Sequence, residues 1–255
     1  MRLVVLKARD GSWVRTLSGP AGTLKRPVSC AIASSGPVLV TDSIRNTVVV
    51  FKSISDERVL RTLPLDAAAV GHPAPFSCPW GVSVIDEDGS PTAVVSYTWN
   101  QRIALYRIHD GALLRHIGVP GHGMGKALDP RGVCATVVRD VIVSDETQRH
   151  LQVVTPTGHV VAVLDPSRQV GPLGDTLPAV AVRTATGEVL VVDTKNHRVL
   201  SLCWASGSLR SSVNAAFGGH GSDAGQLNLP WGVAISSSGQ IWVTDWGNHR
   251  LCAFH

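Results

Sequence analysis

The sequence lacks several features that would assign it to a common class of protein. No apolar run approaches the ~20 residues that a membrane-spanning helix needs, and no secretory signal is visible at the N-terminus. The five cysteines form no CxxC pair, so the sequence offers no zinc module of the RING type. We therefore expect a soluble intracellular protein with reduced thiols, cytoplasmic or nuclear, and no membrane contact.

Helical periodicity and strong charge are also missing. No stretch of ten or more residues shows a clean helical period, while Val-rich runs alternate with turns built from 25 Gly and 15 Pro. This pattern predicts an all-β domain. Charged residues make up only 16% of the chain and the net charge is +4, which permits an acidic partner without requiring one.

A repeat is present instead. Each copy begins with Pro, continues through an apolar strand, a Ser/Gly turn and a second strand that ends in a polar residue, and then enters a short turn and a third strand. The copies begin at Pro27, Pro79, Pro130, Pro178 and Pro230. Intervals of about 50 residues, with room for four short strands each, are typical of propeller blades.

Two segments carry a specific resemblance. "DTKNHRVLSL" (193–202) and "DWGNHRLCAF" (245–254) contain the Asn-His-Arg triplet that names the NHL repeat, and "PWGVAI" (230–235) is similar to the opening of such a repeat. The chain therefore resembles the NHL-repeat β-propeller family, as in the TRIM-NHL proteins. The first three copies depart from the pattern, with Thr47 and His150 in place of the Arg and Tyr97 in place of the Asp.

The motif also has a structural explanation. Asp193 ends a second strand and Arg198 opens the third, and the same spacing joins Asp245 to Arg250. We interpret both pairs as clamps that hold the hairpin closed, with Asn196 in a left-handed or turn-capping conformation. The alternative is that these charges bind a ligand. The clamp is favoured because the motif recurs in each blade.

The termini suggest how the repeats close. Residues 3–7 and 13–17 read as a third and a fourth strand, whereas the C-terminus supplies strands one to three. We predict one domain, residues 1–255, in which residues 1–19 complete the last blade and cover its edge. The ring then has five blades, although part of a six-bladed ring in a longer chain also fits.

The strands that would line the axial channel contain no His, Asp or Glu. They are residues 28–33, 81–85, 132–137, 180–183 and 232–236. A metal site needs three or four converging ligands, so we expect no metal, no cofactor and no enzymatic activity.

One face collects large aromatic and basic side chains. The loops before strand one and the turns between strands two and three lie on the same side of a four-stranded blade, and Trp and Arg are enriched at binding hot spots. The candidate binding residues are Arg45, Trp80, Trp99, Arg102, Arg131, Lys195, Trp231 and Trp246. The alternative is that the tryptophans only fill gaps between blades.

Three functions remain open. The first is a non-catalytic scaffold that binds protein, resembling the substrate-recognising propellers of ubiquitin ligases in this family. The second is a propeller that binds single-stranded RNA, although acidic residues on the same face almost balance the basic ones. The third, a lyase or hydrolase of the propeller type, is disfavoured by the channel residues. We expect a protein partner, no DNA, and a monomer or part of a larger chain or complex.

Overall fold

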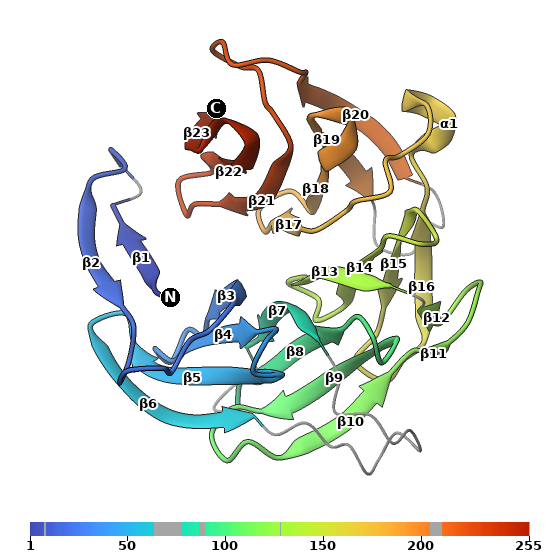
Figure 1. The fold of residues 1–255 in the computed structure, drawn as a ribbon. Helices are drawn as coiled ribbons and strands as arrows, with labels where there is room; N and C mark the ends of the chain where they lie inside the picture. The colour runs from blue at the N-terminus through green and yellow to red at the C-terminus, as the bar shows by residue number, and fades with distance from the viewer. Residues whose placement is uncertain (8, 64–77, 87–89, 128, 205–210, 255) are drawn as a thin grey trace. The chain divides into compact units, whose positions relative to one another are not determined.

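The computed structural model describes residues 1–7, 9–63, 78–86, 90–127, 129–204 and 211–254, and nearly all of its regular structure is β (Figure 1). It divides into two compact units, Met1–Ile117 and Gly118–His255, which we call unit 1 and unit 2.

Unit 1 holds one hairpin and two four-stranded antiparallel sheets. The hairpin pairs β1 (Leu3–Leu6) with β2 (Trp13–Leu17). The first sheet contains β3 (Pro27–Ile32), β4 (Val38–Asp42), β5 (Thr47–Ser53) and β6 (Asp56–Leu63). The second contains β7 (Pro79–Ile85), β8 (Thr92–Tyr97), β9 (Arg102–Arg107) and β10 (Leu113–Ile117). Within each sheet the strands follow one another in sequence order, which is the meander of a propeller blade.

Unit 2 begins with a short parallel pair, β11 (Val119–Pro120) and β12 (Lys126–Ala127). The next sheet contains β13 (Pro130–Ala135), β14 (Val141–Asp145), β15 (His150–Val154) and β16 (Val160–Leu164). After the single helical turn α1 (Ser167–Val170) come β17 (Val180–Arg183), β18 (Glu188–Asp193), β19 (Arg198–Trp204) and β20 (Ser211–Gly218). The last sheet has three strands, β21 (Pro230–Ile235), β22 (Ile241–Asp245) and β23 (Arg250–Phe254). Two 3-10 turns, η2 (Thr194–Asn196) and η3 (Trp246–Asn248), join the second strand to the third in the last two sheets.

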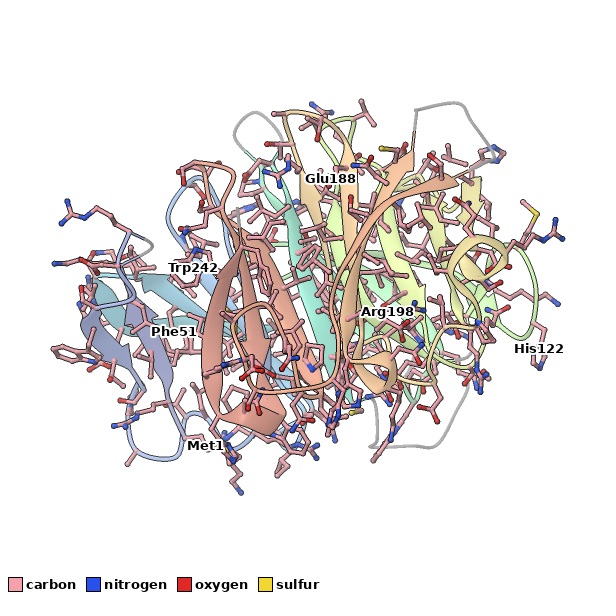
Figure 2. All side chains as sticks on the ribbon, turned by 90° about the horizontal axis from the view of Figure 1, so that it is seen from above. Met1, Phe51, His122, Glu188, Arg198 and Trp242 are labelled. Atoms are coloured by element: carbon pink, nitrogen blue, oxygen red, sulfur yellow. The ribbon has the colours of Figure 1, made fainter. Side chains whose placement is uncertain are left out.

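The apolar pattern of each strand matches its place in the blade. All five residues of β4 are buried, because a middle strand packs against neighbours on both of its faces, whereas the outer strand β6 has exposed and half-buried positions up to the buried Leu63 at its end. In unit 2, side chains from β14, β15 and β16 meet those of β17, β18 and β19 in one apolar cluster. Phe51 of β5 is fully buried in unit 1 and can be followed in Figure 2.

Buried hydroxyls add a polar tie from one sheet to the next. Thr41 Oγ1 donates to the carbonyl of Trp80 in unit 1, and Ser144 Oγ donates to that of Leu177 in unit 2, both at 2.7 Å. Thr194 Oγ1 makes the same kind of bond to the Pro230 carbonyl, also at 2.7 Å. Each hydroxyl lies at the end of a second strand or directly after it, so the ties hold the segments that open the following blade.

The predicted fold class, an all-β propeller with four-stranded blades and almost no helix, is confirmed. The blades begin at or next to the five prolines. The first two strands also form where the sequence predicts them, over residues 3–6 and 13–17. The closure of the last blade by residues 1–19, the single domain and the choice between five and six blades stay predictions.

One local prediction differs from the structure. The left-handed residue of the turn is His197, with φ at +54°, and not Asn196, which lies in η2. Asn196 instead caps the turn through its side chain, since its Nδ2 lies 2.8 Å from Asp193 Oδ2. The same left-handed position recurs at His249, with φ at +53°, so the Asn-His-Arg triplet encodes a cap, a left-handed residue and a clamp in that order.

Candidate functional site

The clamps of unit 2 organise the loops that precede strand one. Arg198 Nε lies 2.8 Å from Asp193 Oδ2, and Arg198 Nη1 reaches the carbonyl of Val170 at 3.1 Å. Asp193 is fully buried, and its second oxygen accepts the N–H of Gly174 at 2.9 Å. One carboxylate and one guanidinium therefore tie the turn after β18 to the loop before β17. Figure 2 labels Glu188, which begins β18, and Arg198, which begins β19 and pairs with Asp193 at the other end of β18.

The last blade repeats this arrangement. Arg250 Nε lies 2.8 Å from Asp245 Oδ2, and its guanidinium also donates to the carbonyls of Ser222 and Gln226. Burial opposes ionisation of Asp245, yet the N–H of Asn228 and the Arg250 guanidinium hold the pKa of this carboxyl below its ordinary value. The carboxylate is charged at neutral pH, as a clamp of this kind requires.

The three degenerate blades use other side chains for the same purpose. Asp145 accepts the backbone N–H of Gln148, whose amide Nε2 also donates to the Lys126 carbonyl. Arg45 donates to the Gly22 carbonyl, and the Tyr97 and Tyr106 hydroxyls share a buried hydrogen bond of 3.0 Å. The missing Arg and Asp of the motif are thus replaced by local contacts in each case.

A pocket of about 230 Å³ opens between the loops of unit 2. Its lining residues come from all three four- or three-stranded sheets of this unit. They lie near the Pro that opens a repeat or in the turn that follows the second strand of a sheet. Its lining consists of Arg131, Glu146, Thr176, Thr194, Lys195, Leu229, Trp231 and Trp246. Four of these, Arg131, Lys195, Trp231 and Trp246, belong to the predicted binding residues.

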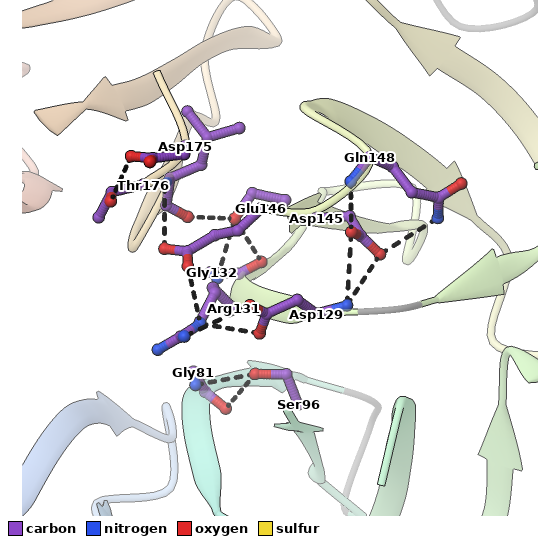
Figure 3. A network of polar contacts seen from close by, with 12 residues as sticks. Gly81, Ser96, Asp129, Arg131, Gly132, Asp145, Glu146, Gln148, Asp175 and Thr176 are labelled. Atoms are coloured by element: carbon purple, nitrogen blue, oxygen red, sulfur yellow. Dashed lines mark hydrogen bonds and ion pairs between the residues drawn. The ribbon is translucent and has the colours of Figure 1, made fainter. Parts of the chain in front are cut away.

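A charged cluster forms one wall of the pocket (Figure 3). Arg131 Nε lies 3.0 Å from Asp129 Oδ1 and 3.2 Å from Glu146 Oε2, so one guanidinium serves two carboxyl groups. The other oxygen of Glu146 accepts the N–H of Leu177 at 3.1 Å. Burial raises the pKa of Glu146 to about 7, because Arg131 offsets only part of the cost of burying the charge and Asp129 and Asp175 add to it.

Two indoles add an aromatic part to the lining. The ring centroids of Trp231 and Trp246 lie 6.1 Å apart with 49° between the ring planes. Trp246 lies in η3 and is 61% exposed, whereas Trp231, directly after the Pro that opens β21, is half-buried. An indole pair of this geometry offers two π-faces to a bound group.

The backbone of Leu229, another lining residue, is fixed by a histidine. Its backbone has φ at +49°, and its N–H donates to His197 Nδ1 at 3.1 Å. Burial and the neighbouring His220 lower the pKa of His197. A neutral imidazole can accept this hydrogen bond, which a doubly protonated ring could not.

The other four predicted binding residues belong to unit 1 and differ in exposure. Trp99 is 63% exposed, and the Arg45 side chain is also exposed. Trp80 is only 7% exposed, which places its indole in the core of unit 1, and Arg102 is half-buried.

Glu146 was missed as a candidate by the sequence reasoning. It directly follows the Asp that ends β14, where the other repeats carry Ser43, Thr98, Thr194 and Trp246. The sequence could have indicated Glu146, because it places a carboxyl group at a position of the repeat where most other copies have a hydroxyl. Its raised pKa depends on Arg131, Asp129 and Asp175, which no repeat alignment brings together.

No group of three or more His, Cys, Asp or Glu side chains that could hold a metal ion occurs within the described ranges. In the same part of the chain, no helix is long and apolar enough to cross a membrane.

Comparison with known proteins agrees with this fold. The family model of the NHL repeat matches residues 227–254, which include β21, β22 and β23. The chain is therefore a propeller with an NHL repeat in its last blade. Among curated proteins, none matches the sequence.

Solved structures give the same architecture over nearly the whole chain. In the nidogen/laminin complex, a chain that is 17% identical superposes with a TM-score of 0.68, over 98% of this chain and 84% of that chain. A catalytically inactive virginiamycin B lyase from Staphylococcus aureus, bound to quinupristin, is 15% identical with a TM-score of 0.63, over 99% and 76%. Glutaminyl cyclase from Myxococcus xanthus is 13% identical with a TM-score of 0.54, over 99% and 95%. At these identities the likeness establishes the fold alone.

Proposed function

We propose that this NHL-repeat propeller is a non-catalytic protein-binding domain, and that the pocket of unit 2 anchors one side chain of the partner. The pocket itself carries this proposal. Its volume of about 230 Å³ is below the roughly 300–1,000 Å³ of sites for whole small molecules, so it suits a single side chain. Trp and Arg, the residues most enriched at hot spots, line it together.

The comparison with nidogen supports the same class of function, since that propeller-like chain was solved in complex with laminin, another protein. A role in recognising substrates for ubiquitin-dependent degradation is a narrower form of the proposal. It requires a zinc module from a partner or from a further segment, because the sequence has no CxxC pair.

RNA binding is the second candidate, and the exposed indole of Trp246 beside Lys195 is the observation that favours it. The charges argue against it. Arg131 is already held by Asp129 and Glu146, so a phosphate would meet two carboxyl groups together with the guanidinium. An RNA site with few unpaired cations would bind weakly at physiological salt.

Catalysis is disfavoured by the lining of the pocket. Glu146 has a pKa close to that of a general acid or base, and two structural neighbours are enzymes. The lining residues nevertheless include no Ser, Cys or His, and the hydroxyl of Thr194 is committed to the Pro230 carbonyl. The other lining hydroxyl, that of Thr176, donates to Asp175 Oδ1 at 3.2 Å, so neither threonine is paired with the carboxyl group of Glu146 as a nucleophile with its base would be.

Affinity capture from a cell lysate with the full chain tests the proposal. The variants are Trp246→Ala, at the pocket, and Trp13→Ala, a matched control because Trp13 is also exposed, at 66%, and lies in unit 1. We expect a protein that Trp246→Ala loses and Trp13→Ala retains, with little change after nuclease treatment or between low and high salt. Retention of every captured protein by Trp246→Ala would contradict the proposal. Capture that nuclease abolishes and salt weakens steeply would establish RNA binding instead.

A further inference from the structure

We infer that the pocket of unit 2 recognises a cationic side chain, that of a lysine, held between the indoles of Trp231 and Trp246 and the carboxylate of Glu146. The inference rests on the proposed protein-binding function and specifies the chemistry of the anchored side chain.

The charges around the pocket leave a negative excess. Arg131 contacts both Glu146 and Asp129, and the charge of Asp175, in the segment before β17, also acts on Glu146. Three carboxyl groups thus stand against two basic side chains, Arg131 and the lining residue Lys195. A further cation delivered by a ligand would balance the buried Glu146, which burial otherwise disfavours in its charged form.

The tryptophan pair supplies the complementary surface. A cation within about 6 Å of an indole face is attracted by the ring quadrupole, and indole is the best of the aromatic side chains in this respect. Trp231 and Trp246, two tilted rings with centroids 6.1 Å apart, line the same pocket as Glu146. A lysine that enters the pocket can lay its methylene stem against this indole pair and bring its ammonium group to Glu146, which lines the same pocket.

Lys195 is the one feature that opposes a cationic ligand. It lies in η2 at the pocket and is exposed, and the described residues include no ion pair for its ammonium group. Its long stem allows the charge to move into solvent when a ligand arrives. An anionic ligand would instead gain from Lys195 and lose against the three carboxyl groups. The two ligand classes therefore respond oppositely to removal of this lysine.

Titration of the full chain with small defined probes decides between them. The probes are N-acetyl-lysine methylamide, its uncharged isostere N-acetyl-norleucine methylamide and N-acetyl-glutamate methylamide, followed through the indole N–H signals in NMR spectra. We expect the lysine probe to shift the signals of Trp231 and Trp246 and to bind roughly fivefold or more tightly than the norleucine probe. Equal binding of these two probes, or preferential binding of the glutamate probe, would overturn the inference.

The pH dependence provides a second readout. The lysine probe stays charged from pH 6 to pH 8, while Glu146, with a pKa of about 7, changes from mostly protonated to mostly ionised. Affinity for the lysine probe should therefore rise up to about tenfold over this range. The groups that face Glu146 are Arg131, Asp129, Asp175 and Lys195, and loss of the pH dependence in Glu146→Gln assigns the rise to Glu146.

Two variants separate recognition from folding. Glu146→Gln keeps the shape and should remove the pH dependence, whereas Lys195→Met keeps the apolar stem and should strengthen binding of the lysine probe about twofold to threefold. Weaker binding of the lysine probe by Lys195→Met would overturn the inference, because removal of a repelling charge must strengthen binding of a cation at this site. If the lysine probe fails while Trp246→Ala still loses a captured protein, the inference is wrong and the proposed function stands.

Discussion

Replacing Arg198 by Ala is expected to weaken unit 2 substantially. The change removes the 2.8 Å contact with Asp193, which is fully buried, and the 3.1 Å bond to the Val170 carbonyl. Loss of one partner from a buried ion pair costs about 3–5 kcal/mol when nothing replaces it. Here Asp193 keeps two donors, the N–H of Gly174 and the Asn196 amide. We therefore expect a loss of about 2–3 kcal/mol in the free energy of unfolding.

The measurement is thermal unfolding followed by tryptophan fluorescence and by circular dichroism. For a chain of this size, 1 kcal/mol corresponds to roughly 2–4 °C in Tm, so a decrease of about 4–12 °C is expected. The matched control is Arg58→Ala, since Arg58 also contacts an aspartate at 2.7 Å but is 70% exposed. An exposed pair contributes little, so the control should melt within about 1 °C of the parent. If both variants melt like the parent while Arg198→Ala loses a bound partner, the clamp is a ligand site and the structural interpretation is wrong.

Two further predictions concern stability. The pKa of Glu146 is raised to about 7 in the folded chain, so folding favours its protonated form. As pH rises from about 4.5 to 7, the parent should therefore lose up to about 3 kcal/mol of stability relative to Glu146→Gln. Urea titrations of both proteins at several pH values measure this difference, and identical pH profiles would refute the unfavourable burial of the charge. Gly218 has φ at +108°, and a Cβ at this position would lie 2.8 Å from the His197 carbonyl oxygen. Gly218→Ala should therefore lower the free energy of unfolding by about 2 kcal/mol or more, whereas the control Gly11→Ala, with φ at +69° and open space around it, should lower it less. Equal changes in Tm for the two variants would show that the close approach at Gly218 is harmless.

The blades could be predicted because their signals are local. A Pro, a five-residue apolar strand, a turn and an Asp five residues before an Arg lie within about 25 residues of one another, and hydrogen bonding between neighbouring strands converts them directly into a meander. The central strand β4 illustrates this, since its apolar start predicts a buried strand and every one of its residues is buried.

The site could be predicted only in part, because exposure is decided by neighbours from other blades. Trp80 and Trp231 hold the same place in the repeat, directly after the opening Pro, yet Trp80 is 7% exposed and Trp231 lines an open pocket. The protonation of Glu146 likewise depends on side chains that lie 15 to 29 residues away in the chain. The repeat pattern predicts where a side chain is placed along the blade, and tertiary packing determines what surrounds it.

One position of the repeat shows how a propeller can gain a specific pocket without a change of fold. Glu146, Thr194 and Trp246 each follow the Asp that ends a second strand, and all three line the same pocket. Thr194 uses its hydroxyl to hold the Pro230 carbonyl, and Glu146 holds the N–H of Leu177, so both also tie one blade to the next. Trp246 projects an exposed indole from the last blade. Since the clamps at Asp193 and Asp245 already fix the backbone of these turns, the following side chain can differ from blade to blade. In the proposed function, recognition therefore depends on the differences between repeats, and folding depends on what they share.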